Sequence, residues 1–104
     1  MSRTVLAADF GGTHLRAAVV DEAGRILHRV DHPTPPANTP QTVMAGVVEL
    51  LTAAAEGVDP RPSAVCIATA GLINADQGKV ILAPNIPGFR NLVMTTPVAE
   101  RLGI

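Results

Sequence analysis

A short glycine turn near the N-terminus carries residue types that suit a phosphate and its metal. Asp9 follows an apolar segment, Gly11, Gly12 and Thr13 come next, and a second apolar segment then ends in Asp21. The Asp9 carboxylate offers the oxygen ligands that Mg²⁺ prefers, directly or through water. Glycines let a phosphate approach backbone amides, and the Thr13 hydroxyl adds a donor. The same residues suit a plain hairpin turn, and their spacing alone does not separate the two interpretations.

Two better-known nucleotide motifs do not occur in this sequence. No Gly-x-x-x-x-Gly-Lys run followed by Ser or Thr is present, so the glycine turn is not a Walker loop. It is not a dinucleotide fingerprint either, because the third glycine is missing and the residues after the turn predict a strand rather than a helix. The sequence also shows no Ser/His/Asp set and no close pair of carboxylates.

Gly71 and Asn85 are two further candidates for contact with a ligand. Gly71 follows an apolar run and stands next to Ala70, and such small residues let a ligand lie against the backbone. Asn85 lies in a loop rich in proline and glycine, and its amide both donates and accepts hydrogen bonds, which suits a sugar hydroxyl. Each position taken alone is more often a strand end or a turn residue.

The composition is that of an apolar globular protein, and it limits the classes of function. With 104 residues, of which 47% are hydrophobic and 16% charged, the chain predicts one small domain rather than a disordered segment. A net charge of −1 without a basic cluster, and only Phe10 and Phe89 as aromatic residues, argue against nucleic-acid binding. We expect neither a signal peptide nor a membrane span, and therefore a cytoplasmic protein. Cys66 lies in an apolar run, which predicts a buried, inert thiol.

Hydrophobic periodicity and turn residues predict the element order β-β-β-α-β. The first three strands are joined by tight turns, which predicts an antiparallel meander. After a proline-rich loop, apolar residues at helical spacing predict a helix that is capped by Asn38 or Thr39 and stops at Gly57. This helix makes a crossover to a fourth strand, and such a connection predicts a mixed sheet. The fourth strand is apolar throughout, which predicts a central position in the sheet. The predicted strands are 4–8, 15–20, 25–31 and 63–69.

The remaining residues predict smaller elements. Two short extended segments, 71–73 and 79–82, flank a loop, and 83–88 is irregular. Residues 95–102 predict a short helix with a threonine cap, a proline in its first turn and Gly103 as its stop. Because the pattern ends where another strand is due, we expect the chain to be the front part of a longer protein.

The glycine turn and three later stretches resemble the ROK family of sugar kinases, and its bacterial glucokinases in particular. This family belongs to the superfamily of actin, hexokinase and Hsp70. The four stretches are 9–16, 21–27, 68–74 and 78–89. They follow one another in the family's order and spacing and span essentially the whole chain. The resemblance implies an α/β, ribonuclease-H-like (actin-like ATPase) fold, of which residues 1–104 form the incomplete N-terminal lobe.

The resemblance also implies an activity, namely ATP-dependent transfer of phosphate to a hexose hydroxyl, with glucose as the first choice. In the family's pattern Asp9 orients the magnesium–phosphate group, and the turn formed by Gly11, Gly12 and Thr13 contacts phosphates. Gly71 and Asn85 are then expected near the sugar, so both belong to the substrate site. A homodimer is implied as well. Many members hold zinc through cysteines, but this chain contains no such ligand set.

This sequence departs from the family's pattern in two places and lacks one element. His14 stands where the family often has Lys or Asn, and Ala70 stands where it often has Pro. The catalytic base of the family follows the next strand, beyond Ile104, so we expect no catalytic residue on this chain and no kinase activity from it alone. A non-catalytic, sugar-sensing regulator of the same family and an activator ATPase of the superfamily are the alternatives. Repressors of the family usually begin with a DNA-binding helix-turn-helix, whereas this chain begins at its first strand.

Overall fold

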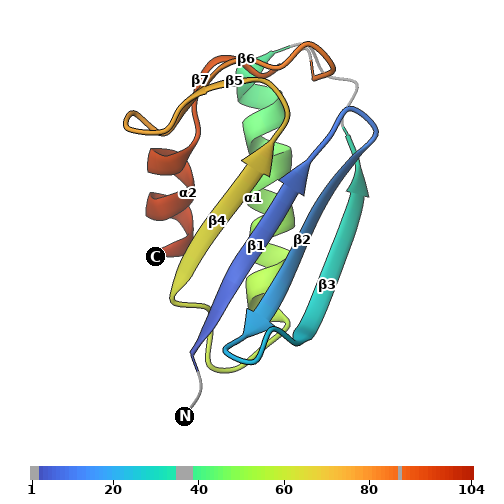
Figure 1. Cartoon of the computed structure of the whole chain (residues 1–104), viewed down its shortest axis with the longest axis vertical. Coiled ribbons are helices and arrows are strands. Elements are labelled where there is room, and N and C mark those ends of the chain that lie inside the picture. The colour runs from blue at the N-terminus through green and yellow to red at the C-terminus, as the bar shows by residue number, and fades with distance from the viewer. Residues whose placement is uncertain (1–2, 35–38, 87) are drawn as a thin grey trace.

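A four-stranded mixed sheet forms one layer of the protein, whose structure is a computed structural model that describes residues 3–34, 39–86 and 88–104. The strand order is β3-β2-β1-β4 (Figure 1). Strands β1, β2 and β3 pair antiparallel, and β4 pairs parallel with β1. This confirms the predicted meander, the crossover and the mixed sheet. The strands are β1 (Thr4–Phe10), β2 (His14–Asp21), β3 (Ile26–Pro33) and β4 (Ala64–Thr69).

Helix α1 (Pro40–Glu56) packs against one face of this sheet. The Thr39 hydroxyl accepts a hydrogen bond of 3.2 Å from the Thr42 amide, so Thr39 caps α1 as predicted. Asn38, the alternative cap, lies outside the described residues. Gly57 follows the last turn, in agreement with the predicted stop. None of the helices in the described part of the chain is long and apolar enough to cross a membrane.

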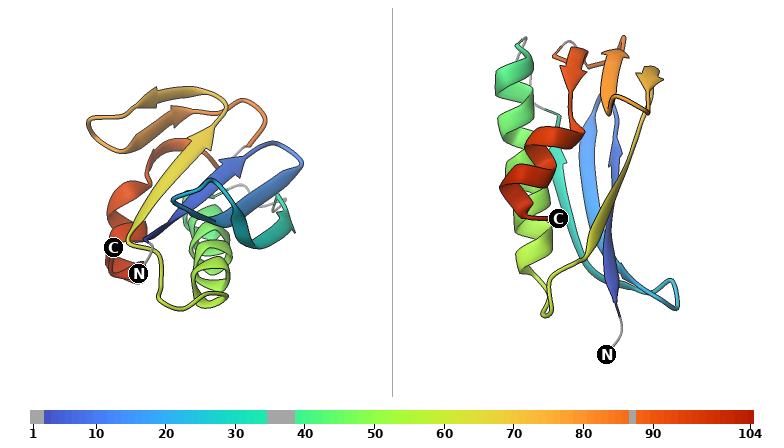
Figure 2. Two further views of the ribbon diagram at one scale, coloured as in Figure 1. Left: turned by 60° about the horizontal axis from the view of Figure 1, so that its bottom comes forward. Right: turned by 90° about the vertical axis from the view of Figure 1, so that its left-hand side faces the viewer.

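Helix α2 (Thr95–Leu102) lies beside α1, on the same side of the sheet (Figure 2). Its predicted threonine cap is wrong, because the residue at the N-cap is Met94 and no side chain caps the helix. The Gly78 carbonyl takes over this role, since it accepts hydrogen bonds from the amides of Met94 at 2.8 Å and Thr95 at 3.3 Å. Gly103, at φ 72°, ends the helix in the left-handed conformation as predicted.

A second, three-stranded antiparallel sheet lies beyond the carboxyl ends of β1 and β4 (Figure 1). It contains β5 (Leu72–Asn74), β6 (Lys79–Leu82) and β7 (Arg90–Val93). The sequence predicts β5 and β6 but misses β7. Strand β7 has only four residues, including an Arg and an Asn, and they show too little alternation of apolar and polar side chains to predict a strand from the local sequence. Pairing with β6 makes them a strand, in the register Val80 to Leu92.

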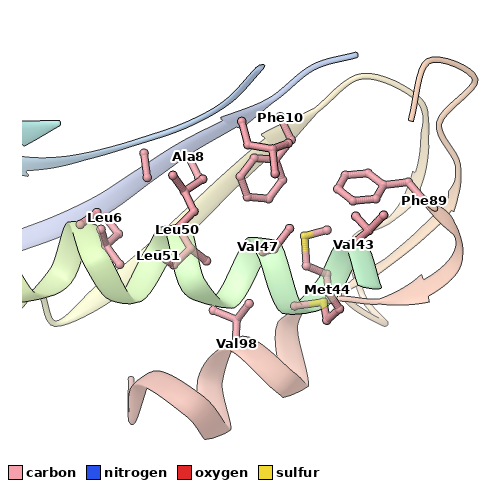
Figure 3. Close-up of a cluster of buried hydrophobic side chains, with 14 of the residues drawn as sticks. Leu6, Ala8, Phe10, Val43, Met44, Val47, Leu50, Leu51, Phe89 and Val98 are labelled. Atoms are coloured by element: carbon pink, nitrogen blue, oxygen red, sulfur yellow. The ribbon is translucent and has the colours of Figure 1, made fainter. Parts of the chain in front are cut away.

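The hydrophobic core lies between α1 and the inner face of the main sheet. Alternate residues of β1 and β2 are buried there. Phe10, at the end of β1, meets Phe89 edge to face, with ring centroids 6.0 Å apart and planes at 66° (Figure 3). The only two phenylalanines of the chain therefore join the main sheet to the loop that precedes β7. The core side chains of β1, β2 and α1 are Leu6, Ala8, Phe10, Leu15, Ala17, Val19, Val43, Met44, Val47, Leu50, Leu51, Ala54 and Ala55.

The opposite face of the main sheet is exposed, and two predictions about β4 are wrong. Strand β4 is an edge strand of the described sheet rather than a central one, and its residues alternate between exposed and half-buried. Cys66 lies on the outer face and is exposed, not buried. An apolar run such as β4 is typical of a strand covered on both faces, whereas the described helices cover only one.

Candidate functional site

The glycine turn joins β1 to β2 at the end of the main sheet. The Gly11 amide donates a hydrogen bond of 2.9 Å to the His14 carbonyl and so closes the turn. Gly12 and Thr13 are exposed at its tip. Within the described residues, the amides of Gly12 and Thr13 donate to no acceptor. The turn therefore presents two backbone donors and the Thr13 hydroxyl, which are groups that bind a phosphate.

Thr34 holds this turn from the neighbouring strand end, and it is not among the site residues predicted from the sequence. Its hydroxyl donates to the Gly11 carbonyl at 2.6 Å, and its amide donates to the Thr13 carbonyl at 2.8 Å. Thr34 follows β3 in a segment that its prolines mark as a loop, so local sequence offers no sign of this contact. The only available signal is the pairing of β2 with β3, which places His14 opposite Pro33 and Thr34 next to the turn.

Asp9 lies on β1 and is exposed on the uncovered face of the sheet. Its cross-strand neighbour is Arg16, which forms an ion pair with Asp31 of β3 at 3.4 Å. In the described ranges, the Asp9 carboxylate takes part in no ion pair and no hydrogen bond. It borders an open cavity of about 260 Å³ that Arg16 and Arg29 also line. A ligand can therefore reach this carboxylate.

The donor set at Asp9 suits magnesium bound together with a phosphate, but not a metal held by the protein alone. No group of three or more His, Cys, Asp and Glu residues in the described part of the chain could hold a metal ion. Magnesium commonly binds one or two carboxylates, keeps several waters, and completes its shell with substrate phosphate oxygens. One free carboxylate near a turn with free amides fits that pattern.

Asn85 lies directly against the glycine turn. A Cβ atom added to Gly12 would lie 2.8 Å from the Cβ of Asn85 and 3.0 Å from its carbonyl oxygen. Only glycine fits this approach without a shift of the neighbouring loop. The structure thus brings together one residue predicted to contact phosphate and one predicted to contact the sugar.

Gly71 lies against the chain segment that leads to Asn85. Its φ of 130° favours glycine, and an added Cβ would collide with the Leu82 carbonyl oxygen and lie 3.0 Å from the Cα of Ala83. The loop beyond is closed by backbone hydrogen bonds, from Ala83 to Phe89 at 3.0 Å and from Phe89 to Ile86 at 2.8 Å. Gly71 and Asn85 therefore belong to two chain segments that pack against each other.

The larger cavities of the described structure lie elsewhere. One of about 650 Å³ lies on the outer surface of α1 and α2, and one of about 460 Å³ lies along the open edge of β4. Neither is lined by Asp9, Gly12, Asn85 or Gly71. The candidate site is therefore an open surface where three loops meet, with hydrogen-bond donors suited to a phosphate at the glycine turn and a side-chain amide suited to a hydroxyl group at Asn85.

Comparison with known proteins identifies relatives of this chain. A model of the ROK family matches residues 5–104. The glucokinase of Streptomyces coelicolor is 37% identical over 101 residues, which make up 95% of this chain and 30% of that protein. The N-acetylmannosamine kinase of Salmonella arizonae is 40% identical over 101 residues, which make up 97% of this chain and 33% of that protein.

A solved structure shows the same fold. It is the crystal structure of a ROK family glucokinase from Streptomyces griseus in complex with glucose and AMPPNP, which superposes with a TM-score of 0.83 at 35% identity. The match covers 97% of this chain and 31% of that chain. The present chain therefore spans about a third of the length of these relatives.

Proposed function

The chain belongs to the ROK family and has the actin-like ATPase fold of its kinases, and from this premise we propose a function. We propose that the chain is the N-terminal part of an ATP-dependent kinase that transfers phosphate to a hexose hydroxyl. One observation carries the proposal, namely the contact between the glycine turn and Asn85. Phosphoryl transfer needs the donor phosphate and the acceptor hydroxyl next to each other, and this contact supports the proposal because it brings the turn assigned to phosphate against the residue assigned to a sugar hydroxyl.

Each residue of the site then has a role in the proposed reaction. The amides of Gly12 and Thr13 donate to phosphate oxygens, and the Thr13 hydroxyl adds a third donor. The Asp9 carboxylate would hold the metal–phosphate group in place, and magnesium bound there would supply positive charge against the charge of the phosphate. Asn85 binds sugar hydroxyls through its amide, and Gly71 lets the sugar lie against the backbone.

Glucose is our first choice of substrate. The Streptomyces griseus glucokinase, at 35% identity, contains glucose in its crystal structure, and the Streptomyces coelicolor relative is also a glucokinase. The N-acetylmannosamine kinase of Salmonella arizonae is as similar as these, so a modified hexose is the substrate to compare with glucose.

We also propose that the general base of the reaction lies beyond Ile104. Asp9 is assigned to the metal–phosphate group, and a sugar hydroxyl needs a separate proton acceptor in the transition state. The 104-residue chain alone is then expected to show no turnover with ATP and hexoses. Clear turnover by the purified chain would overturn this part of the proposal. A homodimer and a cytoplasmic location stay predictions.

A hybrid enzyme tests the proposed function. Residues 1–104 replace the matching segment of the Streptomyces coelicolor glucokinase, and steady-state kinetics are measured with ATP and glucose. We expect activity in the hybrid, and we expect Asp9→Asn to lower kcat by about 10²-fold, as for the loss of one transition-state contact. The glucose KM should stay within about twofold, because Asp9 acts on the phosphate side. Asp76→Asn, which removes an exposed acid in the β5–β6 loop, is the matched control.

Different results point to different functions. An Asp9→Asn effect confined to the glucose KM would contradict the phosphate role. A hybrid that binds glucose without transferring phosphate would support a sugar-sensing regulator. The isolated chain supplies a second test, because titration with Mg-ATP in two-dimensional ¹H–¹⁵N NMR should shift the amide resonances of Gly12 and Thr13. No shift at these amides would count against phosphate binding at the turn.

A further inference from the structure

We propose that Thr34 is a positioning residue of the glycine turn: its hydroxyl and its amide donate hydrogen bonds to the carbonyls of Gly11 and Thr13 and so orient the amides between them toward the ligand. The inference rests on the proposed function, because it takes the turn to be the phosphate site. Thr34 itself need not touch the phosphate. It acts through the backbone of the turn.

Peptide geometry explains how the two hydrogen bonds orient the turn. In a trans peptide the carbonyl of one residue and the amide of the next point in opposite directions. The Gly11 carbonyl accepts a hydrogen bond of 2.6 Å from the Thr34 hydroxyl, and the Gly12 amide therefore points away from Thr34. The Thr13 carbonyl accepts a hydrogen bond of 2.8 Å from the Thr34 amide. The peptide that joins Gly12 to Thr13 therefore lies between two peptides whose carbonyls are fixed by hydrogen bonds.

The glycines make such an anchor necessary. A glycine pair has few steric limits on its backbone dihedrals, so its peptide planes can rotate. A rotated Gly11–Gly12 peptide would turn a carbonyl oxygen toward the phosphate, and two electronegative groups would then face each other. The hydroxyl of Thr34 favours the orientation in which an amide faces the ligand.

The position of Thr34 in the fold supports a specific role. Thr34 is half-buried, and its bond to Gly11 is the shortest side-chain hydrogen bond found among the described residues. Pro33, the last residue of β3, has no amide hydrogen and cannot donate a hydrogen bond. The next residue, Thr34, therefore supplies the backbone donor at this end of the strand. One residue thus uses both of its donors on the same three-residue turn.

The test compares two substitutions in the 104-residue chain. Thr34→Val keeps the shape of the side chain and the backbone hydrogen bond but removes the hydroxyl, whereas Thr34→Ser keeps the hydroxyl. Mg-ATP is titrated into each protein, and the dissociation constant is taken from the amide shifts of Gly12 and Thr13. We expect Thr34→Val to bind about fivefold more weakly, the change that one hydrogen bond of typical net strength supports. Thr34→Ser should bind within about twofold of the wild type.

Ser63→Ala is the matched control, since the Ser63 hydroxyl donates to the Thr4 carbonyl at 3.3 Å at the opposite end of the sheet. It should leave Mg-ATP binding unchanged. If Thr34→Val does not fold, Thr34→Ala removes the same hydroxyl without a buried methyl group. Wild-type binding by the variant without the hydroxyl, or equal loss in Thr34→Ser, would overturn the inference alone. The absence of any Mg-ATP response in the wild type would instead overturn the proposed function on which it rests.

Discussion

Substitution of Gly12 by alanine tests the contact on which the candidate site depends. The added Cβ would lie 2.8 Å from the Cβ of Asn85 and 3.0 Å from its carbonyl oxygen. Neither atom is the end of a flexible side chain, so the whole Asn85 loop has to move. The φ of Gly12 lies outside the left-handed range, and alanine therefore adopts this backbone without strain of its own. Any cost comes from the contact.

Gly11 offers a matched control one residue away. A Cβ there would meet only the His14 carbonyl oxygen, at an ordinary distance of 3.6 Å. Either alanine reduces the entropy of the unfolded chain, which is worth about 0.4–1 kcal/mol of stability. Overpacking at Gly12 costs about 1–3 kcal/mol in addition. The difference between the two variants therefore isolates the contact with Asn85, at about 1–3 kcal/mol in the free energy of unfolding.

Thermal unfolding followed by circular dichroism measures this difference. For a chain of this size about 1 kcal/mol corresponds to roughly 4–8 °C, so the Tm of Gly12→Ala should lie at least about 4 °C below that of Gly11→Ala. In NMR spectra the side-chain amide of Asn85 should shift in Gly12→Ala and stay in place in Gly11→Ala. Equal Tm values together with unshifted Asn85 resonances would refute the reasoning that the glycine turn packs tightly against the Asn85 loop.

Two further predictions concern the support of the site. Phe89→Leu should lower the free energy of unfolding in urea by about 1 kcal/mol and shift the loop resonances, because it removes the ring that meets Phe10; unchanged loop resonances would show that the ring pair does not hold this loop. Asp31→Asn should change stability by less than about 1 kcal/mol, since its ion pair with Arg16 is half-exposed. It should nevertheless weaken Mg-ATP binding at low salt, because the freed Arg16 can turn to Asp9, its cross-strand neighbour. Equal affinity at low and high salt in this variant would contradict that explanation.

Most secondary structure could be predicted from the sequence, because it depends on local patterns. The helical spacing of apolar residues and a threonine cap are enough to place α1, and the alternation and turn residues are enough to place β1 to β3. The prediction fails where an element depends on distant residues. Strand β7 exists through its pairing with β6, and the N-terminus of α2 is capped by the Gly78 carbonyl rather than by a threonine.

Burial could be predicted only in part. A strand whose residues are all apolar is consistent with a central position, and this interpretation of β4 also placed Cys66 in the interior. Whether a side chain is buried depends on what covers it, and the described helices cover only the inner face of the sheet. The opposite face carries Asp9, and its exposure leaves this carboxylate accessible to a ligand.

The sequence by itself determined the glycine turn, since an acid, two glycines and a threonine form one local motif whose residue types suit a phosphate, and the phosphate role of this turn stays a proposal. The roles of Gly71 and Asn85 in sugar binding come from family resemblance and stay predictions. Only the tertiary structure decided that Asn85 lies against Gly12 and that Thr34 binds both carbonyls beside it. These contacts join segments that are distant in the chain, and they arise from strand register and from packing between two sheets, which no local pattern encodes.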